Sequence, residues 1–95
     1  MSEKNQYTLK QRWLDMAEKR AEFRDNYIKM GLKIAYYRKL KNLTQEELAE
    51  KADITLGFLG QIEAPNLYTS FSFNTLFSIA KALEIQPYKI LKFDD

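Results

Sequence analysis

The side chains that could do chemistry in this 95-residue sequence are hydroxyls, amides, carboxylates and basic groups, because there is no Cys and no His. Their absence removes the usual zinc ligands, cysteine nucleophiles and every catalytic triad that depends on imidazole. No pair of Lys or carboxylate residues stands apart from the other charges at a spacing useful for catalysis. We therefore expect no enzyme activity, no metal and no cofactor.

The basic side chains are distributed unevenly, although the net charge is only +2. One cluster has no acidic residue within it: Lys29, Lys33, Arg38, Lys39 and Lys41. Such a cluster suits either phosphate contact or a solvated helix face whose last members complement the helix C-terminus. We favour the solvated face for Lys29 and Lys33, and both interpretations stay open for Lys39 and Lys41.

Two short helices joined by a tight turn are predicted between Thr44 and Glu63. Thr44 and Glu47 form a capping-box signal, in which the hydroxyl accepts the third amide and the carboxylate accepts the amide of the cap. A narrow apolar stripe with helical spacing follows at Leu48, Ala49 and Ala52. The pattern ends at Asp53, a residue type that tolerates the left-handed backbone of a turn.

The second helix of the pair is predicted to begin after Thr55, which is a further N-cap candidate. Ile54 is apolar and can fill the angle between the two helices. Leu59 and Ile62 lie three residues apart, which places both on one inner face. The opposite face is then left with Leu56, Gly57, Gly60 and Gln61.

This stretch resembles the helix-turn-helix of the Cro and phage-repressor-like family, or XRE family, of bacterial and phage DNA-binding proteins. The resemblance covers roughly residues 27–91. The family's first helix is matched by Met30, Gly31, Ile34, Tyr37 and Arg38. Its fourth helix and the apolar residue after it are matched by Phe73, Leu76, Ile79, Ala80, Ala82, Leu83 and Ile85. The resemblance implies an all-α fold with a five-helix, repressor-like domain in residues 27–95. The spacing of apolar residues before this domain predicts an amphipathic helix in residues 1–26.

The N-terminal extension carries a helical apolar seam that needs a partner. Its residues repeat every seven positions at Leu9, Met16, Phe23 and Met30, with Trp13, Tyr27 and Ile34 four residues after three of them. The seam could pack on the domain's own core or on a second chain. We favour a homodimer, because the strip would otherwise be exposed, with contacts from Leu9, Trp13, Met16 and Phe23. A competing dimer contact is the C-terminal apolar cluster of Tyr88, Ile90, Leu91 and Phe93.

The junction between the extension and the domain is left open by the sequence. Asp25 or Asn26 could cap a new helix, but nothing in the sequence forces a break before Tyr27.

The resemblance also implies roles for individual residues. Arg38 and Glu63 match a partly buried ion pair, which is structural because removing one partner would strand a charge. Gln45 matches a position that donates its side chain and backbone amide to a phosphate, as a helix N-terminus favours. The other expected phosphate contacts are Thr44, Thr55, Lys39, Lys41, Asn66, Tyr68 and Thr69. For the loop, the alternative is an ordinary connection whose Leu67 and Phe71 pack into the core.

Base contacts would come from the outer face of the second helix. A Gln61 amide can pair with the N6 and N7 edge of adenine, and Leu56 can touch a thymine methyl. Gly57 and Gly60 stand where the family usually has hydrogen-bonding side chains, and each costs the helix about 1 kcal/mol relative to Ala. Either the backbone approaches DNA closely there, which we favour, or the helix has lost its reading function. Specificity would then depend largely on DNA shape.

The expected function is sequence-specific binding of double-stranded DNA by a transcriptional regulator, a repressor acting as a homodimer. We expect a cytoplasmic protein of bacterial or phage type, associated with the nucleoid when bound. It should have no membrane partner, because no apolar run approaches the length of a membrane span and the N-terminus is unlike a signal peptide. We expect no small-molecule ligand, because little of the chain remains beyond the domain and one helix. The alternative is a protein-binding adaptor or antitoxin-like module with the same fold, which would account for the groove-facing glycines.

Overall fold

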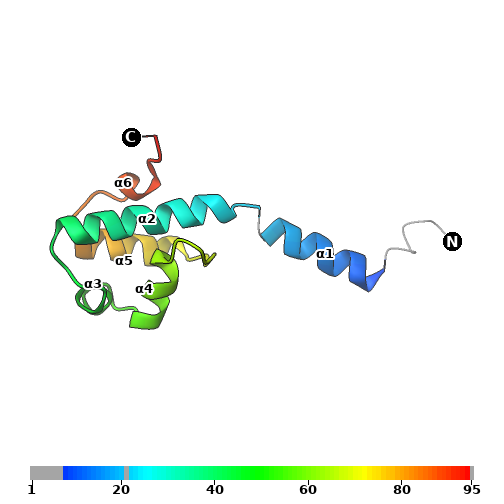
Figure 1. Ribbon diagram of the computed structural model, residues 1–95, viewed down its shortest axis with the longest axis horizontal. Helices are drawn as coiled ribbons and strands as arrows, with labels where there is room; N and C mark the ends of the chain where they lie inside the picture. The colour runs from blue at the N-terminus through cyan, green and yellow to red at the C-terminus, as the bar shows by residue number, and fades with distance from the viewer. Residues whose placement is uncertain (1–7, 21, 95) are drawn as a thin grey trace.

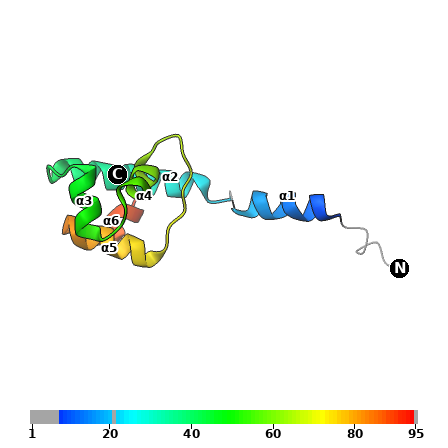
Figure 2. The same cartoon turned by 90° about the horizontal axis from the view of Figure 1, so that it is seen from below.

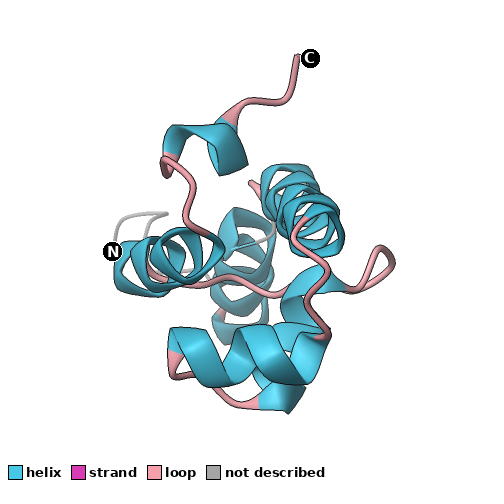
Figure 3. Ribbon diagram, turned by 90° about the vertical axis from the view of Figure 1, so that its left-hand side faces the viewer, coloured by secondary structure: helices cyan, strands magenta, loops and turns pink. Residues whose placement is uncertain are grey.

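The computed structural model describes residues 8–20 and 22–94, and in this part of the chain the regular structure is entirely α-helical (Figure 1; Figure 3). The helices are α1 (Leu9–Arg20), α2 (Arg24–Leu40), α3 (Gln45–Ala52), α4 (Leu56–Glu63), α5 (Phe73–Leu83) and α6 (Tyr88–Leu91). The all-α class is confirmed, with five helices after the N-terminal one.

The hydrophobic core lies among helices α2 to α6. Each of these helices supplies at least one fully buried side chain: Ile34, Leu48, Leu59, Leu76, Ile79, Leu83 and Ile90. α3 packs on α4 and α5, and α2 packs on α4, α5 and α6. Burial of one such side chain contributes roughly 1.5–3 kcal/mol. The core is therefore the main source of stability, and no described residue of α1 belongs to it.

The boundaries of α3, α4 and α5 are set by short polar side chains. The amide of Thr44 donates to Glu47 Oε1 at 2.8 Å, and the amide of Glu47 donates to Thr44 Oγ1 at 3.0 Å, so the capping box is formed. Thr55 and Ser72 accept backbone amides in the same way at the start of α4 and α5. α3 ends at Ala52, and its C-cap residue Asp53 has a φ of 58°, which is left-handed as predicted.

The structure shows where α2 begins, which the sequence left open at the junction between the N-terminal extension and the domain. α2 begins at Arg24, three residues before Tyr27, and its cap residue is Phe23. The amide of Tyr27 donates to the carbonyl oxygen of Phe23 at 3.1 Å. The break thus falls before both Asp25 and Asn26, and neither is the cap. Asp25 lies in the first helical turn, where a carboxylate complements the positive end of the helix dipole.

Helix α1 extends away from the five-helix domain as an arm (Figure 1; Figure 2). The molecule measures 62 × 28 × 23 Å, and the arm lies along the longest axis. Its large apolar side chains face solvent, with 80% of Leu9, 59% of Trp13 and 58% of Met16 exposed. The first seven residues of the expected extension lie outside the described residues. None of the described helices is long and apolar enough to cross a membrane.

The close crossing of α2 and α4 depends on Gly31. A Cβ atom built at this position would collide with the backbone carbonyl of Ile62. Any larger residue would therefore push α4 away from α2. The glycine that the sequence places in α2 is thus required by the position of α4.

Candidate nucleic-acid interface

Helices α3 and α4 form a helix-turn-helix with a short connection at residues 53–55. The amide of Ile54 donates to the carbonyl oxygen of Ala49 at 3.0 Å, and the amide of Asp53 donates to that of Glu50 at 3.2 Å. Ile54 is half-buried and packs against the core. These contacts close the end of α3 and direct the chain into α4.

The two faces of α4 differ in what they present. Its inner face is buried through Leu59, Ile62 and Glu63. The outer face presents Leu56, which is 48% exposed, and Gln61, which is also exposed. Between these two side chains, a Cβ atom built at Gly57 or Gly60 would meet nothing within 4 Å. The outer face is therefore accessible and unusually flat.

An ion pair holds the end of α4 against α2. Arg38 Nε lies 2.9 Å from Glu63 Oε2 and 3.1 Å from Oε1, and Arg38 Nη2 lies 3.0 Å from Oε1. A second arm of the guanidinium, Nη1, donates to the carbonyl oxygen of Leu43 at 2.8 Å. The pair is thus nearly withdrawn from water, and all three guanidinium nitrogens donate hydrogen bonds. This is the arrangement in which a buried ion pair is tolerated.

Gln45 joins this network, which the sequence did not predict. Its Nε2 donates to Glu63 Oε1 at 3.0 Å, and the side chain is half-buried. One amide hydrogen is therefore engaged inside the protein, while the second hydrogen and the oxygen remain available. The signal that could have suggested this contact is the predicted ion pair itself, because a carboxylate accepts several hydrogen bonds. A phosphate contact by Gln45 stays a prediction.

Thr44 and Thr55 both cap helices through their hydroxyl oxygens. Thr44 Oγ1 accepts from the amide of Glu47 at 3.0 Å, and Thr55 Oγ1 accepts from the amide of Phe58 at 3.1 Å. Both are exposed. The Thr44 hydroxyl also interacts with the Glu47 carboxylate, whereas the Thr55 hydroxyl keeps a hydrogen that could be donated to a phosphate. The pKa of Glu47 is lowered from its ordinary value of 4.5, first by the amide of Thr44 and then by its hydroxyl. The carboxylate is thus committed to capping α3.

The loop between α4 and α5 is anchored by aromatic contacts to α2. The ring of Tyr27 lies 6.0 Å from that of Tyr68 and 5.4 Å from that of Phe71, the second pair edge to face. Phe71 is half-buried against the core, as the ordinary-loop interpretation expected, but Leu67 is 46% exposed and does not pack there. Asn66 is also exposed, and Thr69 is half-buried. The aromatic pairs were not predicted.

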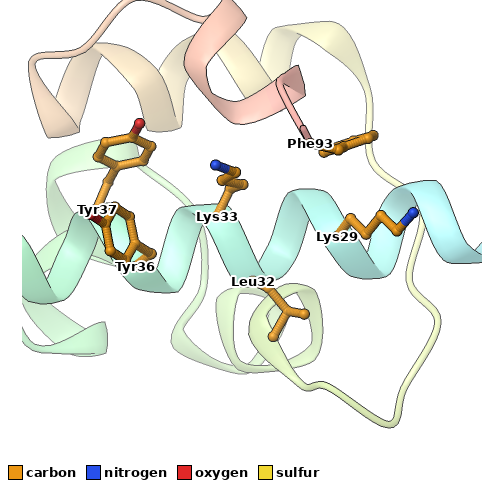
Figure 4. Close-up of a pocket in the computed structure, with 6 residues that line it drawn as sticks. All are labelled: Lys29, Leu32, Lys33, Tyr36, Tyr37 and Phe93. Atoms are coloured by element: carbon orange, nitrogen blue, oxygen red, sulfur yellow. The ribbon is translucent and has the colours of Figure 1, made fainter. Parts of the chain in front are cut away.

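The unopposed basic cluster is divided by the structure. Lys29 and Lys33 line a groove with Phe93, on the side of α2 that carries α6 (Figure 4), whereas α3 and α4 lie on the other side of α2 (Figure 1). Lys29 Nζ lies 5.8 Å from the centroid of the Phe93 ring. Lys39 and Lys41 are exposed at the end of α2, next to the helix-turn-helix. Lys29 and Lys33 are therefore remote from the outer face of α4.

These features define a helix-turn-helix protein, and comparison with known proteins agrees. The profile of the helix-turn-helix family matches residues 34–90, more than half of the chain. The chain therefore belongs to this family, in its XRE-type branch of DNA-binding proteins.

Among solved structures, the fold is similar to the restriction-modification controller protein C.AhdI from Aeromonas hydrophila. The TM-score is 0.64 at 26% sequence identity, covering 70% of this chain and 97% of that protein. No curated protein matches the sequence.

Proposed function

We propose that this protein is a sequence-specific regulator of transcription, a repressor that binds double-stranded DNA as a homodimer. The observation that carries the proposal is the outer face of α4, which is accessible while its inner face is fixed by the Arg38–Glu63 pair. A helix held in this way can enter a major groove without changing its orientation. The similar C.AhdI structure, which is a controller protein by its own description, supports a regulatory role.

In the proposed complex, bases are read by few groups. Gln61 is the hydrogen-bonding side chain on the exposed part of α4 and would contact adenine, while Leu56 would contact a thymine methyl. Gly57 and Gly60 leave room for the DNA backbone or base edges to approach the helix. Phosphate contacts would fix the position of the protein on the duplex. The residues expected to make them are Thr44, Gln45, Thr55, Lys39, Lys41 and, in the loop, Asn66, Tyr68 and Thr69.

The second candidate function is a protein-binding adaptor or antitoxin-like module. The flat surface at Gly57 and Gly60 favours it, because neither residue is required by the packing of α4. A partner protein could lie against such a face without base-reading side chains. DNA binding remains our preferred proposal, because the capping box, the turn and the Arg38–Glu63 pair hold α4 with its outer face accessible.

The deciding experiment measures binding to random genomic fragments at several salt concentrations. Phosphate contacts release counterions, so affinity should fall steeply as salt rises, and specific fragments should be enriched. Gln61→Ala should lose about 1–3 kcal/mol at one base position and keep non-specific binding. The matched control is Gln86→Ala, since Gln86 is exposed in the connection between α5 and α6. A flat salt response without an enriched sequence would rule out the regulator and favour the adaptor.

A further inference from the structure

The arm helix α1 exposes an apolar face that the rest of its own chain does not cover. Leu9, Trp13 and Met16 are each more than half exposed. α1 has 12 residues and no acidic residue in its first turn. Isolated helices of this length are marginal in water, and most helical stability in proteins comes from packing of an apolar face. The arm therefore needs a surface to pack on.

The five-helix domain carries an uncovered apolar groove near the start of α2. Tyr27, Met30, Phe71 and Leu76 line it together with three strongly exposed residues: Phe23, Phe73 and Leu91, with 56%, 68% and 44% of their surface accessible. The remaining lining residues are Asn26 and Ser72, so the groove contains no charged side chain. It is suited to an apolar helix face.

The arm is directed away from the groove of its own domain (Figure 1; Figure 2). Only residues 21–23 separate α1 from α2, and this connection contains no Gly or Pro. The amide of Glu22 donates to the carbonyl oxygen of Lys19, and that of Tyr27 to Phe23, so hydrogen bonds typical of a helix flank the break. In this arrangement α1 does not reach the groove of its own domain. An arm from a second copy can reach it.

Charge disfavours the simplest alternative, in which two arms pair face to face. Helical spacing places Arg12 and Lys19 along one edge of the apolar face, seven residues apart. Asp15 and Glu18 lie on the opposite side of the helix. Two arms packed through their apolar faces would bring basic edges together. The uncharged groove imposes no such repulsion.

We propose that two copies of this chain exchange arms, with α1 of each copy lying in the Phe23–Phe73–Leu91 groove of the other. The inference rests on the proposed homodimer and names the surfaces that form it. Phe23 belongs both to the apolar seam of the arm and to the rim of the groove, so the two-fold axis passes close to it. Exchange of an identical element between protomers is a low-cost route to a symmetric dimer.

The size of the contact is sufficient for a stable dimer. Each copy contributes three aromatic residues, Trp13, Phe23 and Phe73. Such a side chain buries roughly 150–250 Å² when fully covered, and 59%, 56% and 68% of these three are still exposed and available. Leu9, Met16 and Leu91 add to this area. The total is of the order of the roughly 800 Å² per partner that a standard interface buries.

Trp13 provides the test, because it is the single Trp of the chain and lies on the arm. In the full-length protein without DNA, its fluorescence emission should move to shorter wavelength as concentration rises, together with a dimer mass in light scattering. Phe73→Ser, which changes an exposed residue of another helix, should weaken dimerisation by about tenfold or more and leave Trp13 emission at long wavelength. Tyr36→Ser is the control, since Tyr36 is 55% exposed but lies outside the groove.

Mixing two variants makes the test independent of folding defects. The Trp13→Glu chain has no Trp and a defective arm but keeps its groove, whereas the Phe73→Ser chain keeps its arm. Adding excess Trp13→Glu chain to Phe73→Ser chain should restore the short-wavelength emission, because one arm then finds an intact groove. No recovery in the mixture, with circular dichroism showing both variants folded, would overturn the proposal.

Each remaining outcome also decides the question. A Trp13 response that Phe73→Ser does not change would overturn arm exchange in favour of paired arms. A short-wavelength emission in a monomer at every concentration would show packing on the chain's own domain instead. Because no DNA is present, these results are separate from the DNA-binding proposal, which is lost only if the salt-dependent binding described above fails.

Discussion

Arg38 and Glu63 are charged residues whose side chains have only 12% and 4% of their surface exposed. The two side chains hydrogen-bond to each other. Arg38 also donates to the carbonyl oxygen of Leu43, and Glu63 also accepts from Gln45. Removing one partner would leave the other charge in a site with little water, and such single truncations cost about 3–5 kcal/mol. The pair is therefore a structural requirement for the position of α4.

Arg38→Ala should lower the free energy of unfolding by about 3 kcal/mol or more, measured by urea denaturation. Lys39→Ala is the matched control, since Lys39 is the next residue and is exposed; it should change stability by less than about 0.5 kcal/mol. The double variant Arg38→Met with Glu63→Met should lose less free energy of unfolding than the sum of the losses in the two single Met variants. Additive losses would show that the two residues do not act as a pair.

Glu47 makes the capping of α3 dependent on pH. Because the amide and hydroxyl of Thr44 lower its pKa below 4.5 in the folded state, the folded protein binds this proton less readily than the unfolded chain. The resulting stabilisation is present above the unfolded pKa and is lost as pH falls through the folded one.

Glu47→Gln should therefore show a shallower loss of stability than the natural protein as pH is lowered from 6 towards 3. Thermal unfolding followed by circular dichroism at a series of pH values provides the measurement. The two curves should differ in slope below about pH 4.5. Parallel curves would mean that the carboxylate of Glu47 is equally basic in the folded and unfolded states.

At the level of elements, α4 contains two glycines that its own packing does not explain. Neither has a positive φ, and added Cβ atoms at Gly57 and Gly60 would lie in open space. Gly31 in α2 is different, because its Cβ would collide with the carbonyl of Ile62. The fold therefore requires a glycine at position 31 but not at positions 57 and 60.

Gly57→Ala and Gly60→Ala should each stabilise the free protein by about 0.5–1 kcal/mol, because Ala loses less backbone entropy in a helix. If DNA approaches α4 closely there, both should also weaken DNA binding. Urea unfolding should then show higher stability for each variant, and DNA binding measured on the same variant should show lower affinity. Gly31→Ala is the contrasting variant and should be destabilised. Unchanged binding for the α4 variants would argue against close approach of DNA.

At the scale of the whole molecule, the proposed homodimer would present two α4 helices related by a two-fold axis. Successive major grooves on one side of B-DNA are about 34 Å apart. We expect hydroxyl-radical footprinting of an enriched fragment to show two protected half-sites with this separation and a palindromic sequence. Disruption of the dimer by Trp13→Glu should weaken both half-sites together. A single, asymmetric protected site would contradict the two-fold arrangement.

The organisation of the helix-turn-helix could be predicted because its signals are local. Thr44 with Glu47, Asp53 and Thr55 act on backbone groups within a few residues, and the structure forms each of these features. The core positions Leu48, Leu59 and Leu76 followed from helical spacing in the same way, since periodicity determines which face of a helix is apolar. Residue-level DNA contacts remain predictions, because the partner surface is absent from the chain itself.

The sequence by itself determined the caps of α3 and α4, and the family resemblance that it carries implied the five-helix domain and the residues of its ion pair. Only the tertiary structure showed that Gln45 completes this ion pair, that Tyr27 anchors the loop, that Lys29 and Lys33 face away from α4, and that α1 points away from its own domain. Contacts of this kind join residues far apart in the chain, and their distances depend on how whole helices cross. Local spacing specifies the face of each helix, whereas the partner of that face is decided by packing in three dimensions.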